Sequence, residues 1–574
     1  MKRILATLLA AALLLTTVSV ALADEQADLE RLKKKVKRLE QQMRKVQFKA
    51  GTDRVAFTGD MRFEAHNIQS SLPDYYDGMA LQAVMAHTLF YFGATSSLPM
   101  TAQGGLDFDA LGQFIQQNAG NYMAYANSLT FEGLQTGMQN MLAAMAQMNG
   151  MDPATMTPDQ WRMLQDQAMG MMMAAPGVYR DGYDWDNDIM YTSRLRLNMS
   201  AKVSKDFDFA GRLAMYKPWG DSSGVQILNG QSNSLNIDGT TATVPNSDIV
   251  RVERAYFNWH HFLGTDAYLS VGRRPSTEGP PSHFRRDEPR GGTPMGSLID
   301  FQFDGATLGY HINDEMAFRL CYGVGFESGF GNAEQLKTPA DRMKDTHLFG
   351  INWDIHDSED LFIQTTWAHA FDIADGFTGL VVLPNNPLTG DPIGAPMVMR
   401  YTPSTNLGDM NLWGFVVQKK AGPMALFGSY NHMWSSPNDK TTPFGGLFCD
   451  PFDTPTERDG EMYWLGAVYS FPDEATKLGL EYNHGSKYWF SFVQSQDDLI
   501  APKTNTRGDV WEAYLLHRIQ KKFLLKLDYI HYSFDYSGSG WHLGAPKDLT
   551  TTPVLGFPTY KDVDKLMLSM MVSF

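Results

Sequence analysis

Lys565-Leu-Met-Leu-Ser-Met-Met-Val-Ser-Phe574 is the end of the sequence and the stretch that decides its fold. Its residues alternate along an extended chain, and one face is wholly apolar. That face carries Leu566, Leu568, Met570, Val572 and Phe574, whereas the other face carries Lys565, Met567, Ser569, Met571 and Ser573. A strand of this kind needs a dry surface for its apolar face. A soluble sandwich supplies a protein core, and an outer-membrane barrel supplies lipid around a watery lumen.

The N-terminus favours the membrane alternative, because it predicts export. Residues 1–23 begin with Lys2 and Arg3, continue with an apolar run and close on Ala21-Leu22-Ala23, a small-x-small cleavage site. This is the pattern of a secretory signal peptide that is cut after Ala23. No later stretch reaches the roughly 18 uninterrupted apolar residues that a membrane-spanning helix needs. A membrane location therefore requires a closed barrel, whose strands leave no backbone group unpaired in lipid.

Residues 24–50 predict a coiled coil. An apolar seam recurs at alternating spacings of three and four residues, formed by Leu29, Leu32, Val36, Leu39, Met43 and Val46. Lysine and glutamate surround the seam, as in a heptad repeat. A single solvated amphipathic helix is the alternative interpretation. We expect an oligomeric coiled coil in the periplasm, where a trimer would suit a trimeric barrel.

Residues 51–574 predict an all-β fold, a sixteen-stranded antiparallel transmembrane barrel. Period-2 stretches separated by turn residues recur along the chain. The strands are expected near 54–67, 189–203, 207–217, 250–262, 266–274, 297–310, 314–326, 345–356, 360–372, 408–419, 423–434, 460–471, 475–489, 507–519, 522–534 and 562–574. Tight turns alternate with long loops, which is typical of periplasmic turns and extracellular loops. We therefore predict a protein of the bacterial outer membrane, surrounded by its lipid.

The insert 68–188 lacks this alternation of strands, tight turns and long loops, and its sequence predicts helices. Thr157-Pro-Asp-Gln160 has the form of a capping box with proline at the first helical position. Four methionines recur at helical spacing, namely Met138, Met141, Met145 and Met148. Thioethers bind Cu(I), but methionine also fills the cores of helical units, and we expect core packing. The insert is compatible with an extracellular cap and with a plug in the barrel mouth.

Arginines concentrate on the strand faces opposite the apolar rows. They are Arg62, Arg194, Arg196, Arg212, Arg254, Arg274 and Arg319. A guanidinium group on the lipid face near the midplane costs about 2–4 kcal/mol, so we expect all seven side chains to line the pore. Neighbouring strands then form a positive wall, which lowers the barrier for small anionic solutes.

The third long loop, with residues 275–296, is a candidate constriction. It contains side chains of both charges, namely Glu278, Arg285, Arg286, Asp287, Glu288 and Arg290.

With this loop, the strand pattern and the terminal Phe574, the chain resembles bacterial outer-membrane porins, in particular porins with an N-terminal coiled coil from sulfate- and metal-reducing bacteria. The resemblance implies a homotrimer, a third loop folded inward and passive diffusion of small hydrophilic solutes. General porins oppose an acidic loop to a basic wall, so the arginines here favour anions. A loop neutralised by its own salt bridges is the alternative.

Other classes of protein find little support in the sequence. The net charge of −16 argues against nucleic acid as a partner. No G-x-S-x-G, H-E-x-x-H or phosphate-loop motif occurs, so we expect no enzyme, no catalytic residue, no metal and no cofactor.

Cys321 and Cys449 are compatible with a disulfide and with two free thiols. The alternative function is a structural tether or sheath barrel with a closed lumen, which would house a periplasmic or electron-transfer partner.

Overall fold

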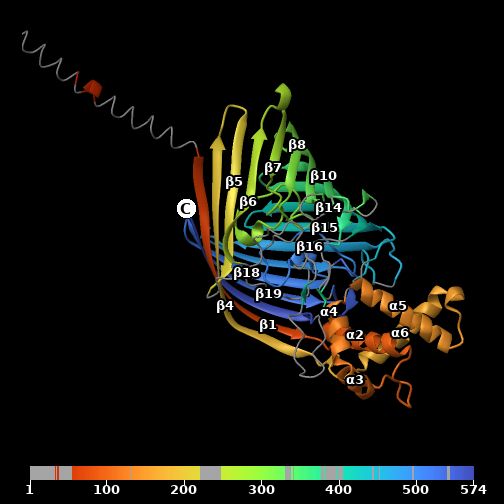
Figure 1. Cartoon of the computed structure of the whole chain (residues 1–574). Coiled ribbons are helices and arrows are strands. Elements are labelled where there is room, and N and C mark those ends of the chain that lie inside the picture. The colour runs from red at the N-terminus through yellow and green to blue at the C-terminus, as the bar shows by residue number, and fades with distance from the viewer. Residues whose placement is uncertain are drawn as a thin grey trace, which may run out of the picture.

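Figure 1 shows the computed structural model, a β-barrel with a cluster of helices beyond one end of its strands. The structure describes residues 55–129, 131–219, 247–329, 342–375, 405–441, 445–450, 453–493, 497–538, 543–551, 553–556 and 558–574, and the short pieces 33, 35–37, 336, 338–339, 380–381 and 397–398. The signal peptide predicted for residues 1–23 lies outside the described residues. So does most of the coiled coil predicted for residues 24–50, of which the described Val36 is helical and exposed.

Sixteen antiparallel strands close the barrel, and the last of them returns to the first. They are β1 (Val55–Leu72), β4 (Tyr183–Lys202), β5 (Phe207–Pro218), β6 (Ser247–Trp259), β7 (Ala267–Arg273), β8 (Asp304–Asn313), β9 (Met316–Phe326), β10 (Thr346–Asp357), β11 (Leu361–Ala374), β14 (Asn406–Ala421), β15 (Met424–Pro437), β16 (Asp459–Ser470), β17 (Thr476–Gly485), β18 (Gly508–Gln520), β19 (Phe523–Phe534) and β23 (Asp562–Ser573). Arg62 of β1 lies opposite Met571 of β23 and opposite Arg194 of β4. The predicted all-β sixteen-stranded barrel is thus confirmed.

Each predicted strand has a counterpart, and the differences lie at strand ends. β1 continues to Leu72, because its last residues keep pairing with the first residues of β4. β8 begins at Asp304 rather than at residue 297, and β17 ends at Gly485 rather than at residue 489. At both of these ends the chain leaves the barrel wall and turns into the interior.

The closing strand β23 shows how the apolar rows are placed. Lys565 and Met567 are buried, whereas Leu568 and Phe574 are half exposed. The outward row continues around the barrel with exposed large side chains, among them Tyr191, Phe257, Leu320, Trp413, Leu465, Leu480, Trp511, Leu527 and Leu568. A continuous apolar outer surface is what a barrel needs when lipid surrounds it.

The insert after β1 is helical, as predicted. Its helices are α2 (Gly78–Thr95), α3 (Phe108–Gln117), α4 (Ala119–Asn127), α5 (Phe131–Met148) and α6 (Pro158–Met173). The capping box at Thr157 forms with Gln160. Met138, Met141 and Met145 are buried in a core that the helices share, whereas Met148 is exposed. No described helix is long and apolar enough to cross a membrane.

Three small sheets accompany the barrel. Their strands are β2 (Tyr75–Asp77) with β3 (Tyr179–Arg180) and β22 (Val554–Gly556), β12 (Leu380–Val381) with β13 (Met397–Val398), and β20 (Tyr536–Ser537) with β21 (Lys547–Asp548). The first of these sheets ties both ends of the helical insert to the segment that precedes β23.

The two cysteines do not form a disulfide. Cys321 lies on β9, where the Thr307 hydroxyl donates to its sulfur at 3.3 Å, and Cys449 is buried in the connection between β15 and β16. Of the two possibilities that the sequence left open, free thiols are the observed one.

Candidate functional site in the barrel lumen

The connection between β7 and β8, residues 274–303, turns into the barrel, and we call it the first inner loop. It reaches walls that face each other across the lumen. Glu278 contacts Arg212 on β5, whereas Phe284 stacks on Phe427 of β15 with ring centroids 5.3 Å apart. Contact with two opposed walls requires the loop to cross the interior. This is the segment where the sequence predicted a constriction.

A second connection, residues 486–507 between β17 and β18, also enters the barrel, and we call it the second inner loop. Its Trp489 and Phe492 are buried. The Asp300 backbone N–H donates to the Phe492 carbonyl at 2.6 Å, and the Phe492 N–H donates to the Leu298 carbonyl at 3.0 Å. The two inner loops are therefore joined by backbone pairing. Sequence reasoning missed this loop, although the apolar residues Phe490, Phe492 and Val493, directly after the expected strand 475–489, were a signal.

Both inner loops pack against one side of the lumen, which is lined by β10, β11, β14, β15 and β16 and which we call the apolar half. The strands contribute Leu348, Phe362, Ala368, Ala370, Met410, Leu412, Val416, Phe427, Met433, Met462 and Trp464, and the loops contribute Met295, Leu298, Phe301, Trp489, Phe490 and Phe492. All of these side chains are buried. This side of the barrel is filled by a core of the kind found in soluble proteins.

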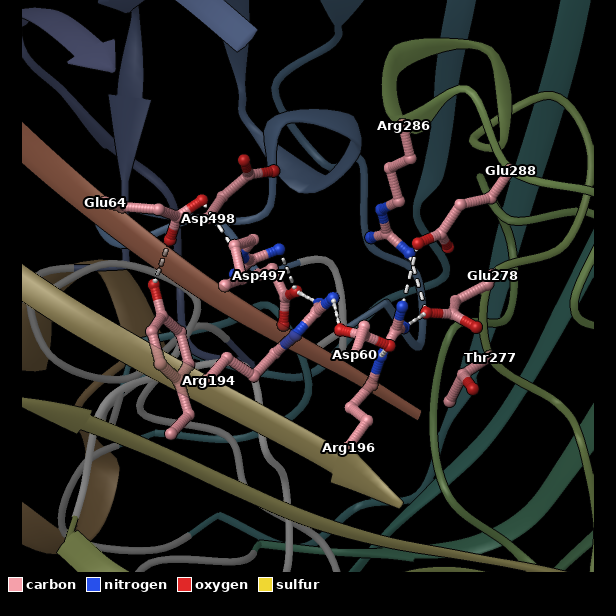
Figure 2. Close-up of polar contacts among 12 residues, drawn as sticks. Asp60, Glu64, Arg194, Arg196, Thr277, Glu278, Arg286, Glu288, Asp497 and Asp498 are labelled. Atoms are coloured by element: carbon pink, nitrogen blue, oxygen red, sulfur yellow. Dashed lines mark hydrogen bonds and ion pairs between the residues drawn. The ribbon is translucent and has the colours of Figure 1, made fainter. Parts of the chain in front are cut away.

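The opposite side is formed by β1, β4, β5 and β6, and we call it the polar wall. It carries five of the seven arginines predicted to line the pore, namely Arg62, Arg194, Arg196, Arg212 and Arg254, and all five are buried inside the barrel. Figure 2 shows Arg194 and Arg196 extending from β4 toward carboxylates of β1 and of both inner loops. The alternation of β1 and β4 places these side chains inside, because the apolar residues between them face outward.

Glu278 of the first inner loop is the centre of the largest charge cluster on this wall. Its Oε1 contacts Arg196 and lies 3.2 Å from Arg286, and its Oε2 lies 2.9 Å from Arg212 and 3.0 Å from Arg254. Burial opposes ionisation, but the Arg212 and Arg196 guanidinium groups outweigh it and hold the pKa of Glu278 well below its usual range. One loop carboxylate thus binds four arginines.

Asp497 of the second inner loop repeats this arrangement on a smaller scale. Its carboxylate contacts Arg194 and lies 2.9 Å from Arg62. Asp60 on β1 connects the two clusters, because its two oxygens lie 3.1 Å from Arg194 and 2.8 Å from Arg196 (Figure 2). Both inner loops therefore reach the polar wall through carboxylates. The second inner loop also shares an apolar cluster with this wall, in which Leu499 and Ile500 are buried together with Ile68 of β1 and Tyr216 of β5.

The remaining charged residues of the first inner loop contact other strands. Arg285 pairs with Asp498 and with Glu512 of β18 at 2.9 Å each, and Glu288 lies 2.8 Å from Arg196. Asp287 contacts Lys477 and Arg518, and the exposed Arg290 lies 2.7 Å from Asp357. The loop is neutralised chiefly by the barrel wall, rather than by the salt bridges of its own residues that the sequence left open.

The last two predicted arginines lie away from the polar wall. Arg274 donates from Nε to the buried Ser270 hydroxyl at 2.9 Å. Arg319 on β9 lies 2.7 Å from Asp354 and donates to Asn352 at 2.8 Å. The structure therefore brings five of the seven predicted arginines together and leaves two apart.

Two cavities flank residues 285–288 of the first inner loop. One, of about 60 Å³, lies against β1, β4 and β23 and is lined by six basic and five acidic side chains. These are Arg62, Arg194, Arg285, Arg286, Lys526, Lys565, Glu64, Glu288, Asp497, Asp498 and Asp528. The other, of about 220 Å³, lies beside the tight turn between β14 and β15. No group of three or more His, Cys, Asp or Glu side chains is placed to hold a metal ion within the part of the chain that the structure describes.

Comparisons with known proteins give one family match. A family model described as "Protein of unknown function (DUF3373)" matches residues 184–574. A search of curated proteins found no match. Among solved structures, OprB of Pseudomonas putida at high pH has a TM-score of 0.38 and 9% identity over 92% of this chain and 96% of its own.

Two further solved structures are similar at the same level. The trimer form of OmpT, an outer membrane protein of Vibrio cholerae, has a TM-score of 0.35 and 13% identity over 69% of this chain and 94% of its own. OmpF of Salmonella typhi, in complex with daunomycin, has a TM-score of 0.36 and 9% identity over 69% and 93% of the two chains. At such values no function is transferred to this chain.

Proposed function

Since the chain belongs to the DUF3373 family of proteins of unknown function, the family assigns it no activity, and we propose from the barrel itself that it is an outer-membrane porin. It passes small hydrophilic, preferentially anionic solutes by diffusion and catalyses no reaction. The observation that supports this most strongly is the contrast between an apolar outer surface and a buried wall of arginines beside a cavity. The outer surface fits lipid, and the wall provides charge along a path.

The solute path runs along the polar wall, between the strands and the inner loops. The apolar half offers no charged route, because loop side chains occupy most of it. The cavity of about 80 Å³ between the first inner loop and β8–β11 has a single charged side chain, Arg274, in its lining. Residues 285–288 separate the two cavities and form the narrowest part of the proposed solute path. The slight excess of basic over acidic side chains around the smaller cavity lowers the barrier for anions relative to cations.

The rest of the chain serves export and assembly. Residues 1–23 act as a signal peptide, and residues 24–50 form a coiled coil in the periplasm that joins three barrels. The helices of the insert cap the barrel on the extracellular side, since they have their own core and gather beyond the ends of the strands (Figure 1).

Reversal potentials across planar bilayers test the proposal. Replacing Arg194 and Arg196 by serine leaves Asp60, Glu278 and Asp497 short of partners, so the preference should move from anions toward cations. The matched control is Arg290→Ser, which removes an arginine of the first inner loop whose exposed ion pair with Asp357 of β10 lies away from the polar wall. A barrel that conducts with an unchanged reversal potential would contradict a path along the polar wall. A barrel that never conducts would favour the tether or sheath instead.

A further inference from the structure

The arginines around Glu278 form a complete anion site whose ligand belongs to the protein. Both carboxylate oxygens are used, Oε1 by Arg196 and Arg286 and Oε2 by Arg212 and Arg254. Guanidinium groups suit a carboxylate, because their planar N–H donors match its two oxygens. The site is also preorganised, since Arg212 donates to Asn198 at 2.7 Å and Arg254 donates to the Thr277 hydroxyl at 2.7 Å.

The ligand is carried by a loop and held in an uncommon backbone conformation. Glu278 has a φ of 65°, in the left-handed region, where a residue with a long side chain is rarely found. Asp287 and Asp497, two further inner-loop carboxylates that contact basic side chains of the barrel wall, have φ values of 50° and 62°. Residues held in this region are strained and cluster at ligand clamps and switches. Release of these loop carboxylates would relieve that strain.

We propose that Arg196, Arg212, Arg254 and Arg286 bind the carboxylate group of a permeating solute, and that Glu278 occupies this site until the solute displaces it. The inference rests on the proposed porin function and names its solute class, small organic carboxylates. Displacement exchanges one carboxylate for another, so the charge of the site is conserved. The first inner loop loses its main contact with the polar wall at that moment, and the path widens.

Charge balance explains why the solute must be an anion. If a neutral solute entered in place of Glu278, the four arginines would lose the carboxylate that they share. Asp60, Glu288 and Glu253 would remain beside them but would leave an excess of buried positive charge, which is destabilising. A second carboxylate restores both the charge and the hydrogen bonds. Neutral sugars of similar size should therefore cross this wall more slowly than carboxylates.

Chemical rescue of Glu278→Gln tests the site directly. The full-length protein in detergent is heated with increasing sodium acetate, at ionic strength held constant with sodium chloride. The variant should be stabilised by millimolar acetate, with half-saturation at least tenfold lower than for the unchanged protein, whose site is already filled. Asp357→Asn is the matched control, because it removes a carboxylate from an exposed ion pair of the same loop, and it should respond like the unchanged protein.

Glu278→Asp covers the case in which the amide variant does not fold. It keeps the charge but shortens the reach, so its acetate dependence should lie between those of the two other proteins. If neither variant is stabilised by acetate more than the unchanged protein, the proposal is wrong. Stabilisation by inorganic phosphate at lower concentration than acetate would overturn the assignment to carboxylates.

Bilayer recordings separate this inference from the porin function. In Glu278→Gln, chloride conductance should rise severalfold, and acetate added to the bath should lower it again by occupying the arginines. If acetate stabilises the variant but no protein conducts, the anion site stands and the porin function fails. If all proteins conduct and acetate changes neither stability nor current, the porin function stands and the exchange is refuted.

Discussion

The apolar half and the polar wall occupy the same barrel but are held together by different forces. In the apolar half, loop side chains such as Leu298 and Trp489 pack into a dry core with lumen-facing strand residues. At the polar wall the first inner loop touches the strands through the ion pairs of Glu278, and the second through the ion pairs of Asp497 together with a smaller apolar cluster around Leu499. A dissolved ion cannot replace apolar contacts, whereas it can replace one member of an ion pair. The apolar half therefore anchors the inner loops, and the polar wall is the side where a path can open.

The largest effect is expected when the anchor is broken. Leu298→Asp places a carboxylate in a site with no exposed surface, among Met295, Phe301 and Phe492. Burying an unpaired charge there should destabilise the packed loops by about 5 kcal/mol. Both inner loops should detach while the closed strands persist, so conductance should rise and a protease should cut within residues 274–303.

The control for this change is Leu263→Asp, at an exposed position in the turn between β6 and β7. It should leave conductance and protease resistance as they are. If Leu298→Asp behaves like this control, the apolar half is not what holds the loops, and the distinction between anchor and path is wrong.

A smaller effect is expected in the helical insert, which lies outside both halves. The His87 ring packs edge-to-face on Tyr122 at 5.3 Å, and burial lowers the pKa of His87 to about 4. Because the unfolded insert takes up a proton near pH 6.5 and the folded insert does not, stability should be lost as the pH falls from 6.5 toward 4. The loss should reach about 3 kcal/mol. Limited proteolysis of residues 78–173 across this pH range measures it, and His87→Phe should abolish the dependence.

The smallest effect concerns conductance without the insert. The Asp77 N–H donates to the Val178 carbonyl at 2.7 Å, so residues 78–177 can be replaced by a short glycine linker between adjacent ends. If the inner loops form the narrowest part of the path, as proposed, the shortened barrel should conduct as the full one does. A severalfold increase would show that the insert plugs the mouth, and would weaken the assignment of the constriction to the loops.

The sequence was sufficient to predict the strands, because period-2 alternation and turn residues are local signals. The cost of a guanidinium group in lipid was enough to predict that Arg194 and Arg196 face inward. The apolar half was missed because an apolar residue on a strand was interpreted as facing lipid. Its signal was present in β14, where Leu412 faces inward and the adjacent Trp413 faces outward, so apolar residues occupy both faces.

The pairing of charges could not be predicted, because it depends on positions far apart in the chain. Glu278 meets Arg196 and Arg212 only after the first inner loop has crossed the barrel. The mixed charges of that loop look self-neutralising in sequence, since arginine and carboxylate alternate within a few residues. Asp497 gives no local signal at all, because its partners Arg62 and Arg194 lie at the other end of the barrel sequence.

Thiol modification of two matched serines tests the central claim, that solutes pass along the polar side and not through the apolar half. Ser569 lines the charged cavity, whereas Ser429 is buried in the apolar half, where its hydroxyl lies 3.3 Å from that of Ser297. Each serine is changed to cysteine in a chain that carries Cys321→Ser and Cys449→Ser, and a charged methanethiosulfonate reagent is added during bilayer recording. The account predicts rapid modification and loss of current for Ser569→Cys, and no reaction for Ser429→Cys. Modification of Ser429→Cys at the same rate, or a Ser569→Cys barrel that conducts unchanged, would contradict it.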